Sequence, residues 1–141
     1  MIFRGLLFGA MRKNGLKSAI TVSSLTFGIG HIINLINGSG TELLPNLLQV
    51  IYATAAGFMF VMIYLKSKSI IACIAAHGIF NALSVFSNEQ EMSTGKQIIS
   101  ALFLALITGS YAVYLAQSIK HEQNNEKRED MDREKAFDNR L

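Results

Sequence analysis

Charge is scarce in the first 119 residues of this 141-residue chain. They hold seven lysines and arginines and three acidic residues. The last 22 residues alone hold six lysines and arginines and seven acidic residues. A soluble domain needs polar residues along the outer faces of its helices. Residues 1–119 are therefore not typical of a soluble domain. The net charge of +3 comes without a basic stripe interleaved with aromatic residues, which argues against a nucleic-acid partner.

Cysteine is nearly absent as well. Cys73 is the one cysteine, so no intrachain disulfide and no multi-cysteine metal cluster can form. It lies in an apolar run, and we expect it to be a small buried side chain. A signal-peptide cleavage site is also lacking after the apolar residues 1–11, which are too short to span a bilayer. They look like the end of a helix, followed by Arg12, Lys13 and Lys17.

Long apolar stretches dominate what is present. A membrane-spanning helix needs about 20 mostly apolar residues. Four stretches approach or reach this length, at residues 18–36, 44–65, 69–86 and 97–119. Pro45 falls in the first turn of its helix, where a missing N–H does no harm. The fold class we predict is an all-α, polytopic transmembrane bundle of about four spanning helices, with a short N-terminal helix remnant.

The basic residues alternate between the connecting segments. Segments 11–17 and 66–68 are basic, segment 37–43 has no lysine or arginine, and 87–96 has one. By the positive-inside rule, we predict a multi-pass protein of the cell membrane, in contact with the lipid bilayer, whose tail is cytoplasmic. We divide the chain into a membrane bundle, residues 1–119, and a charged tail, residues 120–141, which forms a helix or stays disordered. The short chain without targeting features suggests a bacterial source.

Polar side chains inside two of the expected helices point to a site. His31 lies one helical turn after Phe27, and Asn81 lies one turn after His77. At 1.5 Å per residue, His77 is about 13 Å and His31 about 20 Å from the basic side. Intramembrane polar residues usually face the bundle interior or a water-filled cavity. We therefore expect both imidazoles to face inward, with Asn34 near the first.

Small residues beside these positions favour close helix packing. Gly28 and Gly30 flank the first histidine and Gly78 adjoins the second, and small residues let membrane helices approach. Spacing alone leaves other interpretations open. The polar residues could be interhelical hydrogen-bonding groups, two axial ligands of a haem, or part of an ion-conducting bundle.

Three ordered motifs resemble those of the CPBP intramembrane proteases, which include the type II CAAX prenyl endopeptidases and the bacteriocin-processing or Abi proteins. Residues 2–8 are similar to the right-hand part of the first family motif, Glu-Glu-x-x-x-Arg, with Arg4 as its arginine. Phe27 to His31 resembles the second motif, Phe-x-x-x-His. His77 to Asn81 resembles the third, His-x-x-x-Asn/Asp.

The resemblance implies an endopeptidase that hydrolyses peptide or protein substrates within the membrane. One glutamate and His31 would hold the attacking water, directly or through a divalent metal such as zinc with His31 and His77 as ligands. His77 and Asn81 would stabilise the oxyanion, and Arg4 would tether helices or orient a glutamate. These residues, His31, His77 and Asn81, are the catalytic candidates.

The chain departs from the family pattern at the first motif. Counting back from Arg4, both glutamates fall before Met1, so the expected water-activating base is missing and the chain looks truncated at its start. Glu42, Glu89 and Glu91 lie in segments expected on the far side from the basic loops. We therefore expect little peptidase activity from these 141 residues alone. The alternative is a non-catalytic membrane protein, such as a bacteriocin self-immunity factor or a pseudoenzyme.

Overall fold

The described part of the chain folds into helices alone. The computed structural model describes residues 7–37, 42–85 and 92–138. Its elements are α1 (Phe8–Met11), η2 (Arg12–Asn14), α2 (Leu16–Ile29), η3 (Gly30–Ile32), α3 (Ile33–Ile36), α4 (Leu43–Ser67), α5 (Ile70–Val85) and α6 (Thr94–Asp138). The short α1 corresponds to the predicted helix remnant, although residues 1–6 lie outside the described part.

Within residues 7–37, 42–85 and 92–138, three helical stretches are long and apolar enough to cross a membrane. They are Leu16–Ile36, Leu43–Ser67 and Thr94–Ala136, and Ile70–Ala82 is a shorter apolar helix. The predicted span 69–86 is thus the short one, and residue 86 lies outside the described residues. Large aliphatic side chains such as Ile71 and Leu106 are mostly exposed on the outer faces. Lipid solvates such faces, so the all-α membrane bundle predicted from the sequence is confirmed.

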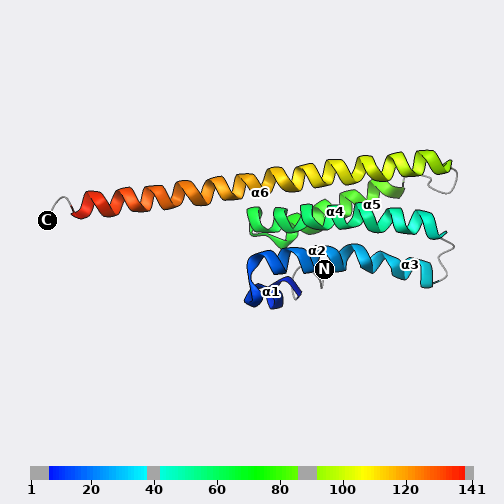
Figure 1. The fold of residues 1–141 in the computed structure, drawn as a ribbon, viewed down its shortest axis with the longest axis horizontal. Coiled ribbons are helices and arrows are strands. Elements are labelled where there is room, and N and C mark those ends of the chain that lie inside the picture. Colours follow the sequence, from blue (N-terminus) through cyan, green and yellow to red (C-terminus); the bar gives the residue numbers. More distant parts are fainter. Residues whose placement is uncertain (1–6, 38–41, 86–91, 139–141) are drawn as a thin grey trace.

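The helices run up and down beside one another (Figure 1). The chain passes along α2 and α3, returns along α4, passes back along α5 and returns again along α6. At 1.5 Å per residue, the 45 residues of α6 extend for about 68 Å, and its red C-terminal end projects well beyond the bundle. The helix crosses position 120 without a break, so the charged tail is helical up to Asp138.

A polar contact fixes the register of α6 against the end of α4. Lys66 pairs with Glu122, and its Nζ donates to Ser118 Oγ at 2.9 Å. Both partners lie near the point where α6 leaves the bundle. The Lys66–Lys68 turn and the start of the charged tail therefore lie at the same end of the molecule, as the alternation of basic segments predicts.

Two glycines allow α2 and α4 to approach closely. A Cβ added to Gly28 would lie 1.9 Å from Thr54 Oγ1, and one added to Gly57 would lie 2.9 Å from the carbonyl oxygen of Ser24. The prediction is therefore confirmed for Gly28 and wrong for Gly30 and Gly78, where an added Cβ would meet nothing within 4 Å.

A tight turn joins α4 to α5 and sets the depth of the site. Lys68 adopts the left-handed conformation, φ +55°, and its N–H donates to the Tyr64 carbonyl at 2.8 Å. The turn makes α4 and α5 antiparallel. Phe60 on α4 and His77 on α5 are eight and nine residues from Lys68, so they lie at nearly the same depth. Cys73 is buried, as predicted, and its Sγ donates to the Phe60 carbonyl at 3.3 Å.

Candidate active site

The two intramembrane histidines meet on one aromatic ring. Phe27 lies edge-on to His31 with 5.4 Å between ring centroids, and edge-on to His77 with 5.6 Å. Each contact is a T-shaped arrangement of the kind favoured by the ring quadrupole. Phe27 and His31 come from α2 and η3, whereas His77 comes from α5. The folded chain therefore brings together the two sequence motifs that the spacing placed on separate helices.

Asn81 lies against His77, one helical turn further along α5. Asn81 Nδ2 lies 3.2 Å from His77 Nε2. An amide nitrogen can only donate, so this contact is a hydrogen bond when Nε2 is the unprotonated nitrogen of the His77 ring. The imidazole and the carboxamide thus form one hydrogen-bonded unit, in agreement with the predicted placement of these two residues on one helix face.

An aromatic cluster supports the histidines from behind. Phe60 of α4 is 1% exposed, and its ring lies edge-on to His77 at 5.6 Å and to Phe80 at 6.1 Å. Phe27 lies edge-on to the same ring at 6.0 Å. Sequence reasoning did not select Phe60 or Phe80, because an aromatic residue in a membrane helix carries no distinguishing signal. Phe60 thus packs directly on the His77 ring and on Phe27, the ring that His31 also contacts.

A small cavity lies among these side chains. Its volume is about 60 Å³, and it is lined by Phe27, His31, Gln49, Tyr52, Ala53, Ala56, Phe60, His77, Phe80 and Asn81. A water molecule takes about 30 Å³ in the liquid, so one or two would fit. The lining combines two imidazoles and two carboxamides with apolar and aromatic walls. The cavity is partly open, because Asn81 is exposed on α5.

Side chains of α4 connect to the segment that carries His31. Asn46 Nδ2 donates to the His31 carbonyl at 2.9 Å, and Asn34 Nδ2 donates to Gln49 Oε1 at 3.1 Å. Asn34 thus lies close to the site, as predicted, although it is not one of the residues that line the cavity. Sequence reasoning missed Asn46 and Gln49. The signal that could have found them is that both are polar residues in an otherwise apolar helix.

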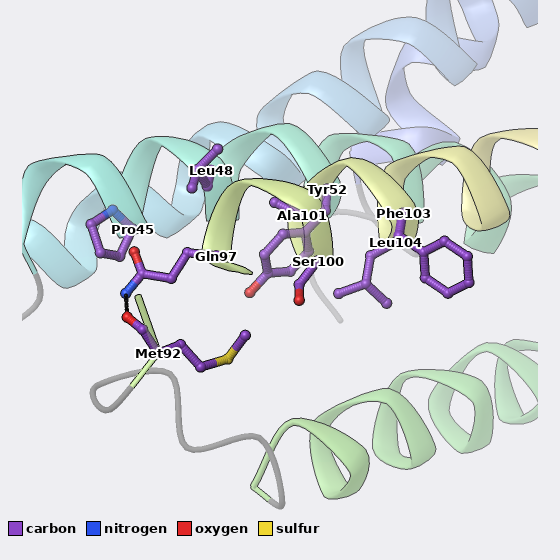
Figure 2. Close-up of a pocket in the computed structure, with 9 residues that line it drawn as sticks. All are labelled: Pro45, Leu48, Tyr52, Met92, Gln97, Ser100, Ala101, Phe103 and Leu104. Carbon is purple, nitrogen blue, oxygen red and sulfur yellow. Dashed lines mark hydrogen bonds between the residues drawn. The ribbon is translucent and has the colours of Figure 1, made fainter. Parts of the chain in front are cut away.

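A larger pocket lies between α4 and α6 (Figure 2). Its volume is about 250 Å³, and it is lined by Pro45, Leu48, Tyr52, Met92, Gln97, Ser100, Ala101, Phe103 and Leu104. Gln97 Nε2 donates to the Met92 carbonyl at 3.1 Å on its wall. The larger pocket contains no histidine, whereas His31 and His77 both line the smaller cavity. Tyr52 lines both, which makes the two pockets neighbours.

The described residues do not complete a metal centre. They contain no group of three or more His, Cys, Asp and Glu side chains placed to hold a metal ion. Zinc sites use three or four protein ligands, and His31 and His77 supply two. Glu42 is exposed at the start of α4, while Arg4, Glu89 and Glu91 lie outside the described residues. None of the described residues that line the histidine cavity is a carboxylate.

Comparison with known proteins assigns this arrangement to a family. The model of the family described as type II CAAX prenyl endopeptidase Rce1-like matches residues 1–83, which include Phe27, both histidines and Asn81. The chain therefore belongs to this family of CAAX-type membrane peptidases. The match ends at residue 83, within the last turn of α5, so the long C-terminal helix α6 lies outside it.

A curated relative supports the assignment. The chain is 31% identical over 113 residues to a Bacillus subtilis (strain 168) protein named "Putative membrane peptidase YdiL". The aligned part covers 74% of this chain and 41% of the relative, so the chain spans about two fifths of the relative's length. No solved structure matches the chain.

Proposed function

We propose that the protein acts as an intramembrane endopeptidase to which this chain contributes the imidazole and carboxamide groups of the site. The supporting observation is the convergence of His31 and His77 on Phe27, with Asn81 bonded to His77. Peptide hydrolysis needs a held water and hydrogen-bond donors for the developing oxyanion. His31 is proposed to hold the water, and His77 with Asn81 to donate to the oxyanion.

A carboxylate is the missing part of this proposal. An imidazole can accept a proton from water, but the family pattern assigns that step to a glutamate that precedes Arg4. The printed sequence has no acid before Glu42. Zinc with His31 and His77 as ligands stays a proposal from the family resemblance, and two imidazoles are fewer than the three or four protein ligands of a zinc site. No step above depends on the metal.

The two adjoining pockets support a peptide substrate that reaches the site from within the bilayer. The larger pocket is mainly apolar and shares Tyr52 with the histidine cavity. We propose that it holds an apolar side chain near the cleaved bond. The basic segments support a topology in the cell membrane with residues 11–17, the Lys66–Lys68 turn and the C-terminal half of α6 in the cytoplasm.

The test is an assay in liposomes with a quenched fluorescent peptide. It compares the 141-residue chain with an extended chain that carries Glu-Glu directly before Met1. Cleavage is expected from the extended chain and only weakly from the shorter one, because a general acid–base group contributes about 10² to 10⁴ in rate. Cleavage that persists in the extended chain after His31→Ala would refute the proposed site.

One observation favours a second function. Because the described lining of the cavity contains no carboxylate, we also propose, as the alternative, a non-catalytic membrane protein such as a bacteriocin self-immunity factor. The discriminating measurement is survival of cells that express the chain and are challenged with a bacteriocin. Protection that is retained by His31→Ala and His77→Ala would support the non-catalytic function, whereas loss with either would support proteolysis.

A further inference from the structure

Two hydrogen bonds join α4 to the segment that carries His31. Asn46 Nδ2 donates to the His31 carbonyl at 2.9 Å, and Asn34 Nδ2 donates to Gln49 Oε1 at 3.1 Å. The partners are three residues apart on each side, 31 and 34 on one segment and 46 and 49 on the other. Residues three apart lie on one helix face. Because the two segments run antiparallel (Figure 1), the two bonds tie the same short stretch of both segments together, and we call them the amide clamp.

The backbone at His31 departs from a regular α-helix. Gly30–Ile32 forms the 3₁₀ segment η3, and α3 continues from Ile33. A 3₁₀ turn is tighter than an α turn, and its hydrogen bonds have poorer geometry. The direction of the His31 side chain depends on how this turn is wound. The hydrogen bond from Asn46 on α4 to the His31 carbonyl holds this 3₁₀ turn in place.

Asn46 is placed for this contact and for little else. It is 1% exposed, and its Oδ1 has no hydrogen-bond donor among the residues that the structure describes. An amide buried in a membrane protein with half of its polar atoms unpartnered is unfavourable. The hydrogen bond to His31 is the interaction that its Nδ2 makes across helices. Gln49, the α4 member of the second bond, also lines the histidine cavity.

We propose that Asn46 is a positioning residue for His31, and that the Asn34–Gln49 bond assists it. The clamp holds the 3₁₀ turn against α4 and thereby holds the imidazole of His31 beside Phe27 and the cavity. The effect on turnover rests on the proposed peptidase function. The effect on the orientation of His31 does not, and it is measured separately.

The experiment records NMR spectra of the protein labelled in its histidine rings, in lipid nanodiscs, for the wild type and Asn46→Leu. The chain has three histidines, and His121 on the exposed tail is an internal reference. The His31 ring resonances are expected to move in Asn46→Leu, while those of His121 stay in place. Asn46→Gln, which keeps a carboxamide donor, is expected to move them less.

A matched control separates positioning from general stability. Thr108 of α6 is 1% exposed, and its Oγ1 bonds only within its own helix, to the carbonyls of Leu104 and Ala105 among the contacts described. Thr108→Val removes a buried polar group far from the clamp and is expected to leave the His31 resonances unchanged. A folded Asn46→Leu protein with wild-type His31 resonances would overturn the proposal.

Turnover by the chain extended with Glu-Glu is the second readout. Asn46→Leu is expected to lower kcat by about 10²-fold with little change in KM, because a misplacement of about 1 Å can have that effect. Wild-type kcat in the folded variant would contradict the positioning role. No turnover by the wild type, together with a moved His31 resonance, would refute the proposed function and leave the positioning role supported. If Asn46→Leu does not fold, Asn46→Gln and Gln49→Leu replace it, and unmoved resonances in both overturn the proposal.

Discussion

Phe27 lies edge-on to His77, with 5.6 Å between the ring centroids, although the two residues are on helices separated by the whole of α4 in the sequence. The same phenylalanine lies edge-on to His31. One ring therefore relates the two imidazoles to each other. The phenylalanine of the Phe-x-x-x-His motif thus has a structural role, since it forms the surface on which both histidines pack.

Removal of either site histidine is expected to abolish cleavage. His31→Ala and His77→Ala in the extended chain should each lower kcat by at least about 10²-fold, because each removes a group that we propose to act on the water or the oxyanion. The measurement is cleavage of a quenched peptide in liposomes. His121→Ala on the exposed tail is the control and should cleave normally. Equal losses in all three variants would indicate a general defect.

Asn81 is expected to affect the rate more than substrate binding. Asn81→Ala removes the group that contacts His77 Nε2 at 3.2 Å. Loss of one oxyanion donor commonly lowers kcat by about 10² to 10³-fold, so a fall of that size with little change in KM is expected. Steady-state kinetics of the extended chain measure both constants. A change confined to KM would assign Asn81 to substrate binding instead.

The close approach of α2 and α4 is expected to tolerate no side chain at Gly28. A Cβ there would overlap Thr54, including its Cα at 2.9 Å, so the helices must separate. Gly28→Ala should destabilise the fold by about 1–3 kcal/mol, the usual range for overpacking. Thermal unfolding in detergent measures the change. Gly109→Ala is the matched control, because an added Cβ there meets nothing within 4 Å.

The pocket between α4 and α6 is expected to affect substrate binding. Ala101 is 4% exposed and lines this pocket (Figure 2). Ala101→Leu would fill part of its volume of about 250 Å³ and should raise KM for peptides with a large apolar residue near the cleaved bond. Peptides with a small residue there should be affected less. Ala75→Leu, at an exposed position on α5, is the control, and equal effects of both would contradict the assignment.

The topology can be measured by cysteine labelling from one side of the membrane. Ser67→Cys and Gln123→Cys, in a Cys73→Ala background, should react with an impermeant maleimide from the same side, because Lys66 pairs with Glu122 there. Asn37→Cys, at the opposite end of the bundle, should react from the other side. Labelling of Ser67→Cys from outside intact cells would reverse the proposed orientation.

The sequence predicted the membrane bundle because the signal is local. A run of about 20 apolar residues reports its own environment, and the alternating basic segments report their side of the membrane independently of the fold. The limits of these stretches agree with α2–α3 and α4 within a few residues. The third stretch, predicted at 69–86 as the shorter one, agrees with α5 as closely, and α5 is short for a membrane span. The fourth continues as a helix through the charged tail, because glutamate, lysine and arginine favour helix as readily as lipid-facing residues do.

Spacing alone also predicted the two halves of the candidate site. Phe27 with His31 and His77 with Asn81 are neighbours along single helices, and a four-residue interval is enough to place them together. Their meeting in one cavity required the tertiary structure, because it depends on Gly28 and Gly57 drawing α2 against α4 and on the Lys68 turn setting the depth of α5. Phe60, Gln49 and Asn46 belong to the site only through contacts between helices. Such contacts leave no periodic trace in a sequence, since they depend on which faces of which helices the packing brings together.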